Sequence, residues 1–311
     1  MMRRTLFSLS GLVVATFLAG CGSDPDMMLM AGNNQGAIAE GNALYQQAKQ
    51  ADDAGQTGKA IKLYDRTATR YSYIDNAPQA RFRQAELLEQ NGEVLKAFKA
   101  YQEFLTRFQG SGLYSTALSR QASMANAAAE GEIKNSFLGL KTRLSVEKIV
   151  EMLGQVRDNA PKSATAAKAQ FMIGELHRKD KKAAKAIAAY RQLVRDQPDC
   201  KEAPDAMFQI GVALTEEADR GNQNMATIDL AREAFNDYLN QYPGHHRNAE
   251  ARQRIAGLGG RDLDRSFEIA EYYFKTGQFE SAKVYYRDIV KRSGSGKLHD
   301  KSKARLREMG E

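Results

Sequence analysis

The hydrophobic positions of this chain repeat in a fixed pattern. A small residue is followed four positions later by an aromatic one, which places both side chains on one face of a helix. The pattern occurs at Ala60 and Tyr64, Ala97 and Tyr101, Ala186 and Tyr190, Ala231 and Phe235, and Ala282 and Tyr286. Runs of alternating β-branched residues are missing, so the pattern predicts helices and no sheet.

A second small residue precedes each of these copies, at Ala48, Ala85, Gly174, Gly211 and Ala270. The two small residues are 12 apart except between Gly211 and Ala231, where 20 predicts an eight-residue insertion around Glu216 to Gln223. Glycines lie between them at Gly55, Gly92 and Gly277, and prolines follow at Pro198 and Pro243. Each copy therefore predicts two antiparallel helices that meet closely at the small residues, with the aromatic filling the space toward the next copy.

A sixth, weaker copy spans residues 113–161, where Ile149 and Leu153 take the small and aromatic places and Pro161 marks the end. Residues 298–309 follow the last copy as a polar closing helix. Such helix pairs cannot bury their apolar faces alone and must stack. The repeats resemble the tetratricopeptide repeat, so we expect an all-α tetratricopeptide-repeat solenoid of about six helix pairs over residues 41–311.

The first 20 residues read as a cleaved leader. Arg3 and Arg4 precede an apolar stretch from Leu6 to Leu18 that is short for a membrane span. It ends in Leu18-Ala19-Gly20-Cys21, which resembles the bacterial lipobox, and the alternative is an ordinary leader with an accidental cysteine. The resemblance implies a diacylglyceryl group and an acyl chain on Cys21, which together anchor a protein stably to a bilayer.

Residues 21–40 then read as the lipidated cysteine and a flexible tether. Gly22 stands where aspartate is the usual inner-membrane retention signal, so we expect a lipid anchor at the periplasmic face of the outer membrane. Cys200 is the other cysteine, either an incidental half-buried thiol or one with an intermolecular or redox role.

Charge and motifs exclude several classes of function. The net charge of +7 falls to +5 without Arg3 and Arg4, and basic residues alternate with acidic ones, so we expect no nucleic-acid partner. None of the four histidines has a second ligand three or four residues on, so we expect no metal. Without a nucleophile elbow or a glycine-rich phosphate or dinucleotide motif, we expect no enzyme and no cofactor beyond the lipid on Cys21.

The first helices of the repeats are expected to line a groove. Aromatic residues recur there at one register, at Tyr45, Phe82, Phe171, Phe208 and Phe267. They are read either as packing between repeats or as a platform for a bound peptide. On the second reading the groove residues are Tyr45, Lys49, Phe82, Phe171 and Arg178.

Two stretches go beyond a generic repeat. The first runs from Ala43 to Ala48 with Gly55 and Ala60-Ile61. The second is Arg261-Asp262-Leu263, then Ile269-Ala270-Glu271-Tyr272-Tyr273, Gly277 and Ala282. With the lipobox they resemble the BamD-like family of outer-membrane assembly lipoproteins, although six repeats stand where five are typical.

The resemblance implies a non-enzymatic scaffold for inserting β-barrel proteins into the outer membrane. Its partners would be the barrel insertase with periplasmic repeat domains, other assembly lipoproteins and unfolded outer-membrane proteins. Arg261, Glu271 and Tyr272 would bind the insertase; for Arg261 the alternative is a surface arginine beside an acid. The competing function is a tetratricopeptide lipoprotein that coordinates cell-wall or cell-division complexes, and an enzyme such as a cell-wall lyase would need a catalytic domain for which little chain remains.

Overall fold

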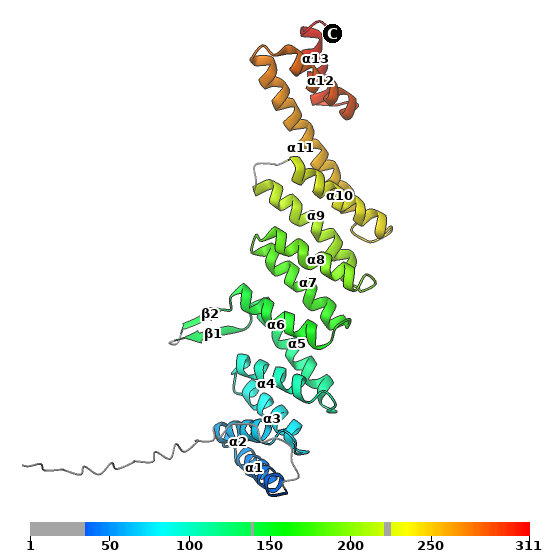
Figure 1. The fold of residues 1–311 in the computed structure, drawn as a ribbon. Coiled ribbons are helices and arrows are strands. Elements are labelled where there is room, and N and C mark those ends of the chain that lie inside the picture. The colour runs from blue at the N-terminus through cyan, green and yellow to red at the C-terminus, as the bar shows by residue number, and fades with distance from the viewer. Residues whose placement is uncertain (1–34, 138–139, 221–224) are drawn as a thin grey trace, which may run out of the picture. The chain divides into compact units, whose positions relative to one another are not determined.

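A computed structural model describes residues 35–137, 140–220 and 225–311, and Figure 1 shows its elements. The described ranges hold thirteen helices and one hairpin of two strands. The helices are α1 (Gln35–Asp53), α2 (Thr57–Arg70), α3 (Ala77–Gln90), α4 (Val94–Arg107), α5 (Tyr114–Glu130), α6 (Val146–Asn159), α7 (Ala164–Lys179), α8 (Ala183–Asp196), α9 (Ala203–Arg220), α10 (Met225–Gln241), α11 (Asn248–Lys275), α12 (Phe279–Ser293) and α13 (Lys297–Glu308). In chain order they form six pairs and a closing helix, so the predicted fold class is confirmed.

The described residues divide into two compact units, one ending at Leu88 and the other beginning at Glu89. In the first unit, α1 and α2 form a hairpin, and Ala80 and Leu87 of α3 join its buried cluster. In the second unit each helix from α4 to α13 packs on the next one in the chain. Nearest-neighbour packing of this kind is what stacked helix repeats require.

Helix α1 begins at Gln35, five residues before the predicted end of the tether at residue 40. Gly41 explains the extension, because a Cβ there would lie 2.9 Å from the ring of Tyr71, which follows α2. The Tyr71 hydroxyl also donates to a Glu40 carboxylate oxygen at 3.2 Å. The predicted leader, Cys21 and most of the tether lie outside the described residues. No described helix combines the length and apolar character needed to cross a bilayer.

The expectation of no sheet is wrong. Strands β1 (Lys134–Phe137) and β2 (Leu140–Arg143) form an antiparallel hairpin between α5 and α6, with Lys134 opposite Arg143 and Phe137 opposite Leu140 (Figure 1). Each strand has only four residues, too few for an alternating pattern to register. The hairpin lies inside the weak copy and separates its two helices; Ile149 and Leu153 are buried on α6 as that copy predicts.

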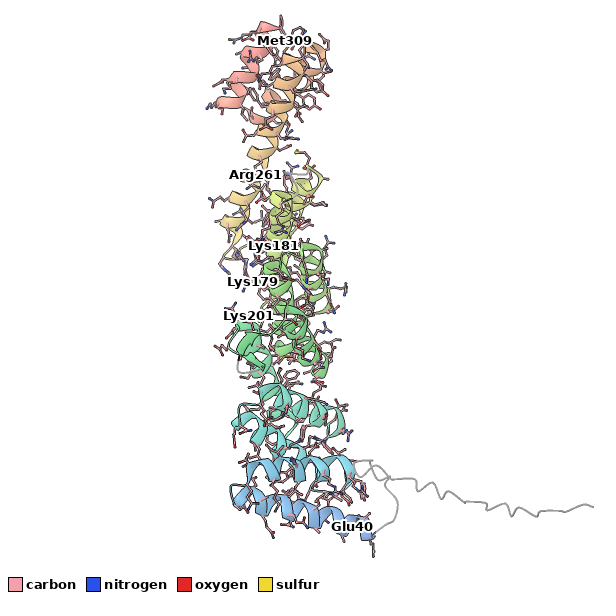
Figure 2. The ribbon with its side chains drawn as sticks, turned by 90° about the vertical axis from the view of Figure 1, so that its left-hand side faces the viewer. Glu40, Lys179, Lys181, Lys201, Arg261 and Met309 are labelled. Carbon is pink, nitrogen blue, oxygen red and sulfur yellow. The ribbon has the colours of Figure 1, made fainter. Side chains whose placement is uncertain are left out.

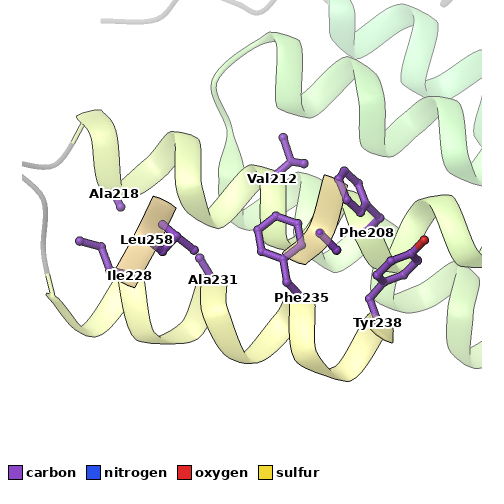
Figure 3. Packing of buried hydrophobic residues seen from close by; sticks show 9 residues of the cluster. Phe208, Val212, Ala218, Ile228, Ala231, Phe235, Tyr238 and Leu258 are labelled. Carbon is purple, nitrogen blue, oxygen red and sulfur yellow. The ribbon is translucent and has the colours of Figure 1, made fainter. Parts of the chain in front are cut away.

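The predicted insertion lengthens two helices. Helix α9 continues to Arg220 and α10 starts at Met225, six residues before Ala231. Ala218 and Ile228, on the added turns, are buried in one cluster with Phe208, Phe235 and Leu258 of α11 (Figure 3). The insertion therefore extends the core of the fifth pair.

The turns between paired helices explain the recurring glycines. Gly55, Gly92 and Gly277 have φ of 70°, 75° and 74°, a left-handed conformation that glycine adopts without steric penalty. In the fourth pair Lys181 takes the same place with φ of 59°. A non-glycine residue in this region costs about 1–2 kcal/mol.

Candidate interaction surfaces and the sites within them

The small residues and the aromatics meet inside the fourth and fifth pairs. A Cβ added to Gly174 would lie 2.4 Å from a ring carbon of Tyr190, and one on Gly211 would lie 2.7 Å from Phe235. Tyr190 also belongs to a buried cluster with Ala206 and Ile210 of the next helix. The aromatic was expected only to fill the space toward the next copy, but it first covers the small residue of its own pair.

Four of these aromatics are tyrosines whose hydroxyl reaches an acid on the first helix of the same pair. The donor–acceptor distances are 3.3 Å from Tyr64 to Asp52, 3.1 Å from Tyr101 to Glu89, 2.5 Å from Tyr190 to Glu175 and 2.6 Å from Tyr286 to Glu271. Burial is the largest cause that raises the pKa of Tyr64, Tyr190 and Tyr286. Sequence reasoning missed these contacts, but the sequence does carry a signal for them. The aromatic of the fifth pair is Phe235, which has no hydroxyl, and this pair has Val212 at the position where the fourth and sixth pairs carry an acid.

An arginine also holds each of these carboxylates. Arg83 lies 2.7 Å from Asp52, Arg120 lies 3.3 Å from Glu89 and Arg305 lies 2.8 Å from Glu271. Each of these arginines comes from a helix beyond the pair, so the acid joins neighbouring elements. The hydrogen bond from Arg305 is the largest cause that lowers the pKa of Glu271.

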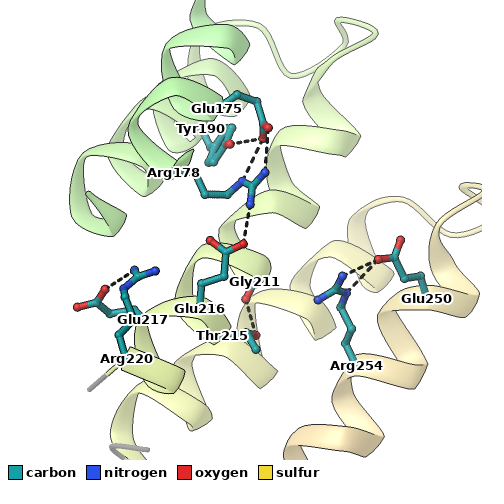
Figure 4. A network of polar contacts seen from close by, with 10 residues as sticks. All are labelled: Glu175, Arg178, Tyr190, Gly211, Thr215, Glu216, Glu217, Arg220, Glu250 and Arg254. Carbon is teal, nitrogen blue, oxygen red and sulfur yellow. Dashed lines mark hydrogen bonds and ion pairs between the residues drawn. The ribbon is translucent and has the colours of Figure 1, made fainter. Parts of the chain in front are cut away.

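The fourth pair uses a variant of this arrangement (Figure 4). Arg178 sits on the same helix as Glu175, pairs with it at 3.1 Å and reaches Glu216 of α9 at 2.5 Å. Burial works to raise the pKa of Glu175, but the bonds from Arg178 and Tyr190 outweigh it and the pKa lies below its ordinary value. Arg178 thus bridges two consecutive first helices.

The structure separates the predicted groove residues into two groups. Lys49 is exposed, and Tyr45 and Phe171 are half-buried against Tyr64 and Tyr190, with ring centroids 5.9 and 5.8 Å apart. Phe82 is only 7% exposed, as the packing interpretation expects. Among the other aromatics of this register, Phe208 is fully buried under the guanidinium of Arg247, whose central carbon lies 3.6 Å from the ring centroid.

The predicted partner-binding residues also differ in availability. Arg261 on α11 (Figure 2) pairs with Asp219 of α9 yet keeps a side chain 41% exposed. Glu271 is occupied by Tyr286 and Arg305, whereas Tyr272 is 62% exposed. Among the described residues five large hydrophobic side chains are exposed, and three of them, Tyr272, Phe279 and Val284, lie on the α11–α12 hairpin.

A surface hollow lies where α8, α9 and α10 meet. Its volume is about 380 Å³, and Val194, Met207, Ile210 and Leu214 supply apolar lining. Arg191 and Arg195 come from α8, and Glu233 and Asp237 from α10. Sequence reasoning did not single out this hollow, because its lining comes from three helices with no common motif.

Two segments of the chain match models of known protein families. Residues 141–294 match the model of the YfiO family, described as an outer membrane lipoprotein, and residues 45–112 match a tetratricopeptide-repeat model. The chain is a tetratricopeptide-repeat protein that carries a domain similar to this outer membrane lipoprotein family. Arg261, Glu271, Tyr272 and the hollow of α8–α10 all lie in its lipoprotein domain. No curated protein matches the chain in sequence.

Several solved structures of repeat proteins are similar to this chain. A thermophilic tetratricopeptide-repeat protein of Thermus thermophilus is 15% identical with a TM-score of 0.31, and the match covers 70% of this chain and 98% of that one. A tetratricopeptide-repeat protein of Parabacteroides merdae is 14% identical with a TM-score of 0.32, covering 87% of this chain and 98% of that one.

The lipoprotein domain also holds a cluster that sequence reasoning missed. Asp205 of α9 lies beside His245 and His246 of the loop between α10 and α11. Ligand spacing along one helix does not detect this cluster, because its residues come from separate segments. Cys200 is half-buried, and burial raises the pKa of its thiol.

Proposed function

We propose that this lipoprotein is a non-enzymatic scaffold of the machinery that inserts β-barrel proteins into the outer membrane. Its partners are the barrel insertase with periplasmic repeat domains, other assembly lipoproteins and unfolded outer-membrane proteins. The observation that carries the proposal is the match of residues 141–294 to an outer membrane lipoprotein family. Both matched families consist of interaction domains, and a protein–protein scaffold is the function they support.

The anchor is a second part of the proposal. We place it on Cys21, with the leader of residues 1–20 removed and the repeats held at the periplasmic face of the outer membrane. Two or three acyl chains give stable membrane attachment, whereas a single chain does not. The +5 charge of the remaining chain is distributed among acids and supports no nucleic-acid role.

We assign insertase docking to the α11–α12 hairpin. Tyr272 and Phe279 are 62% and 48% exposed, and large aromatic side chains are the usual anchors of protein interfaces. The ring of Phe279 packs edge-on against Phe274 at 5.7 Å, so it is presented in a fixed position. Glu271 supports this surface indirectly, because it binds Arg305 and Tyr286. Arg261 lies closer to the N-terminus of α11.

The test is affinity purification of the full-length chain from gently solubilised outer membranes, with mass spectrometry of the proteins that follow it. Near-stoichiometric recovery of the barrel insertase is expected. The double variant Tyr272→Ser, Phe279→Ser should lose the insertase, while Leu230→Ser, which replaces another exposed apolar residue, should retain it. Arg261→Ala tests separately whether the arginine contributes to insertase binding.

The alternative function gives a different result. If cell-wall enzymes or division proteins came down and the insertase did not, the assembly role would be refuted. The protein would then be a scaffold for those complexes. Retention of the insertase by the double variant would refute only the docking surface. Circular dichroism of each variant separates lost docking from lost folding, because the side chains of Leu230, Tyr272 and Phe279 are exposed.

A further inference from the structure

The loop between α10 and α11 brings three metal-binding side chains together. Asp205, His245 and His246 each offer a ligand atom, and these atoms all lie within 4.8 Å of one another. Imidazole nitrogen and carboxylate oxygen are ligands that Zn²⁺ prefers. We propose that these residues form a binding site for a Zn²⁺-type transition-metal dication.

The separations suit a tetrahedral ion after a small adjustment. Zinc binds nitrogen at about 2.0–2.1 Å and carboxylate oxygen at about 2.0–2.2 Å, so two ligand atoms of one ion stand about 3.3–3.5 Å apart. Closing from at most 4.8 Å needs a movement of about 1.5 Å or less. The ring of His246 is exposed and can rotate about its side-chain bonds to make this movement.

The loop itself is held in place before any ion arrives. The backbone N–H of His245 donates to the carbonyl of Tyr242 at 3.2 Å, and that of Asn248 donates to the carbonyl of His245 at 3.0 Å. The side-chain amide of Asn248 donates to the same Tyr242 carbonyl at 3.1 Å. A ligand set on a fixed loop loses little conformational entropy on binding.

One histidine has a hydrogen-bond partner that can orient its ring. The hydroxyl of Tyr238 lies 2.6 Å from Nδ1 of His245. When this nitrogen carries the proton and donates to Tyr238, Nε2 is left as the metal ligand. Hydrogen bonding through the second nitrogen orients the ring and is typical of metal-binding histidines. Tyr238 is fully buried, so it can hold this orientation.

The local charge sets the strength of the site. Arg247 lies 3.3 Å from one oxygen of Asp205, which leaves the other oxygen for an ion. The arginine also pairs with Glu250 at 3.0 Å, and this acid offsets part of its positive charge. Three protein ligands leave a fourth position of a tetrahedral ion for water. The site is independent of the proposed assembly function.

Zinc binding to the full-length chain, purified in detergent without a histidine tag, tests the proposal. Calorimetry with Zn²⁺ should give one ion per chain, and Co²⁺ should develop visible bands of a tetrahedral complex. Asp205→Asn and His246→Ala should each weaken binding at least about tenfold, as losses around metal sites do. His299→Gln removes a histidine outside the cluster and should leave binding unchanged.

Three results would overturn the site. These are no stoichiometric binding by the wild-type chain, wild-type affinity in both cluster variants, or loss of binding in Cys200→Ser while the cluster variants still bind. The last result would assign the ion to the thiol, a ligand that soft metals prefer. His246 is exposed, so His246→Ala keeps its fold and a lost signal reports on ligation.

Discussion

Gly174→Ala tests whether the small residue is required by the ring above it. In a helix interior alanine is favoured over glycine by about 1 kcal/mol. The new Cβ, however, would lie 2.4 Å from a carbon of Tyr190, against a normal carbon contact of about 3.5–4.0 Å, so the ring must move by about 1 Å. Tyr190 is fully buried and its hydroxyl is 2.5 Å from Glu175, so there is little room for that movement.

The balance predicts a less stable protein. Overpacking a core costs about 1–3 kcal/mol, and weakening the bond to Glu175 adds about 1 kcal/mol, which together exceed the helix gain. We therefore expect the free energy of unfolding to fall by about 1–3 kcal/mol. A Cβ at Gly259, in the middle of α11, meets nothing within 4 Å, so Gly259→Ala should instead raise stability by about 1 kcal/mol.

The assay is urea unfolding of the two variants and the wild type, followed by far-ultraviolet circular dichroism. The midpoint should move down for Gly174→Ala and up for Gly259→Ala. If Gly174→Ala raised the midpoint as far as Gly259→Ala does, close contact with the ring would impose no constraint. The packing explanation of the repeat pattern would then fail.

Four further outcomes are expected. Tyr190→Phe should lower the free energy of unfolding by about 1.5–3 kcal/mol, since it removes a donor to the carboxylate of Glu175; unchanged urea unfolding would contradict this. Lys181→Gly should raise thermal stability by up to about 1 kcal/mol by relieving a left-handed backbone, unless melting curves show no gain. The pKa values of Glu175 and Glu271 lie below the ordinary 4.5, so the stability from these acids is present above about pH 4.5 and is lost as pH falls through their folded pKa values. Urea midpoints measured across that range should therefore decline, and a flat profile would argue against the arginine and tyrosine contacts. Cys21→Ser should fold normally but leave the membrane fraction after a high-salt wash, and its retention would count against lipid anchoring.

The repeat framework was predictable because it depends on local periodicity. The small residues at 48, 85, 174, 211 and 270 and their partners on the second helices are buried as the spacing implies. Prolines and glycines marked the helix ends because they restrict or extend the backbone conformations available. The turn at Lys181 escaped notice because lysine carries no such signal, and the four-residue strands were too short to show alternation.

The candidate sites were less predictable because they depend on contacts between distant segments. Glu271 was expected at an interface, yet Arg305, 34 residues later, occupies it. Asp205 and His245 are 40 residues apart in sequence and meet only when α9 and the loop after α10 pack. Exposure of Tyr272 and burial of Phe82 likewise follow from which neighbours cover each helix face, and a single-helix register does not specify that.

Helix α11 connects the fifth helix pair to the sixth. Its 28 residues correspond to a length of about 42 Å, with the N-terminal part packed on α10 and the remainder on α12. Over that length, a rotation of about 5° at one end moves the other end by about 4 Å. A change of packing beside α10 that rotated the helix by this angle would therefore displace Tyr272, about 36 Å away, by about 3 Å, which is comparable to the width of a side chain.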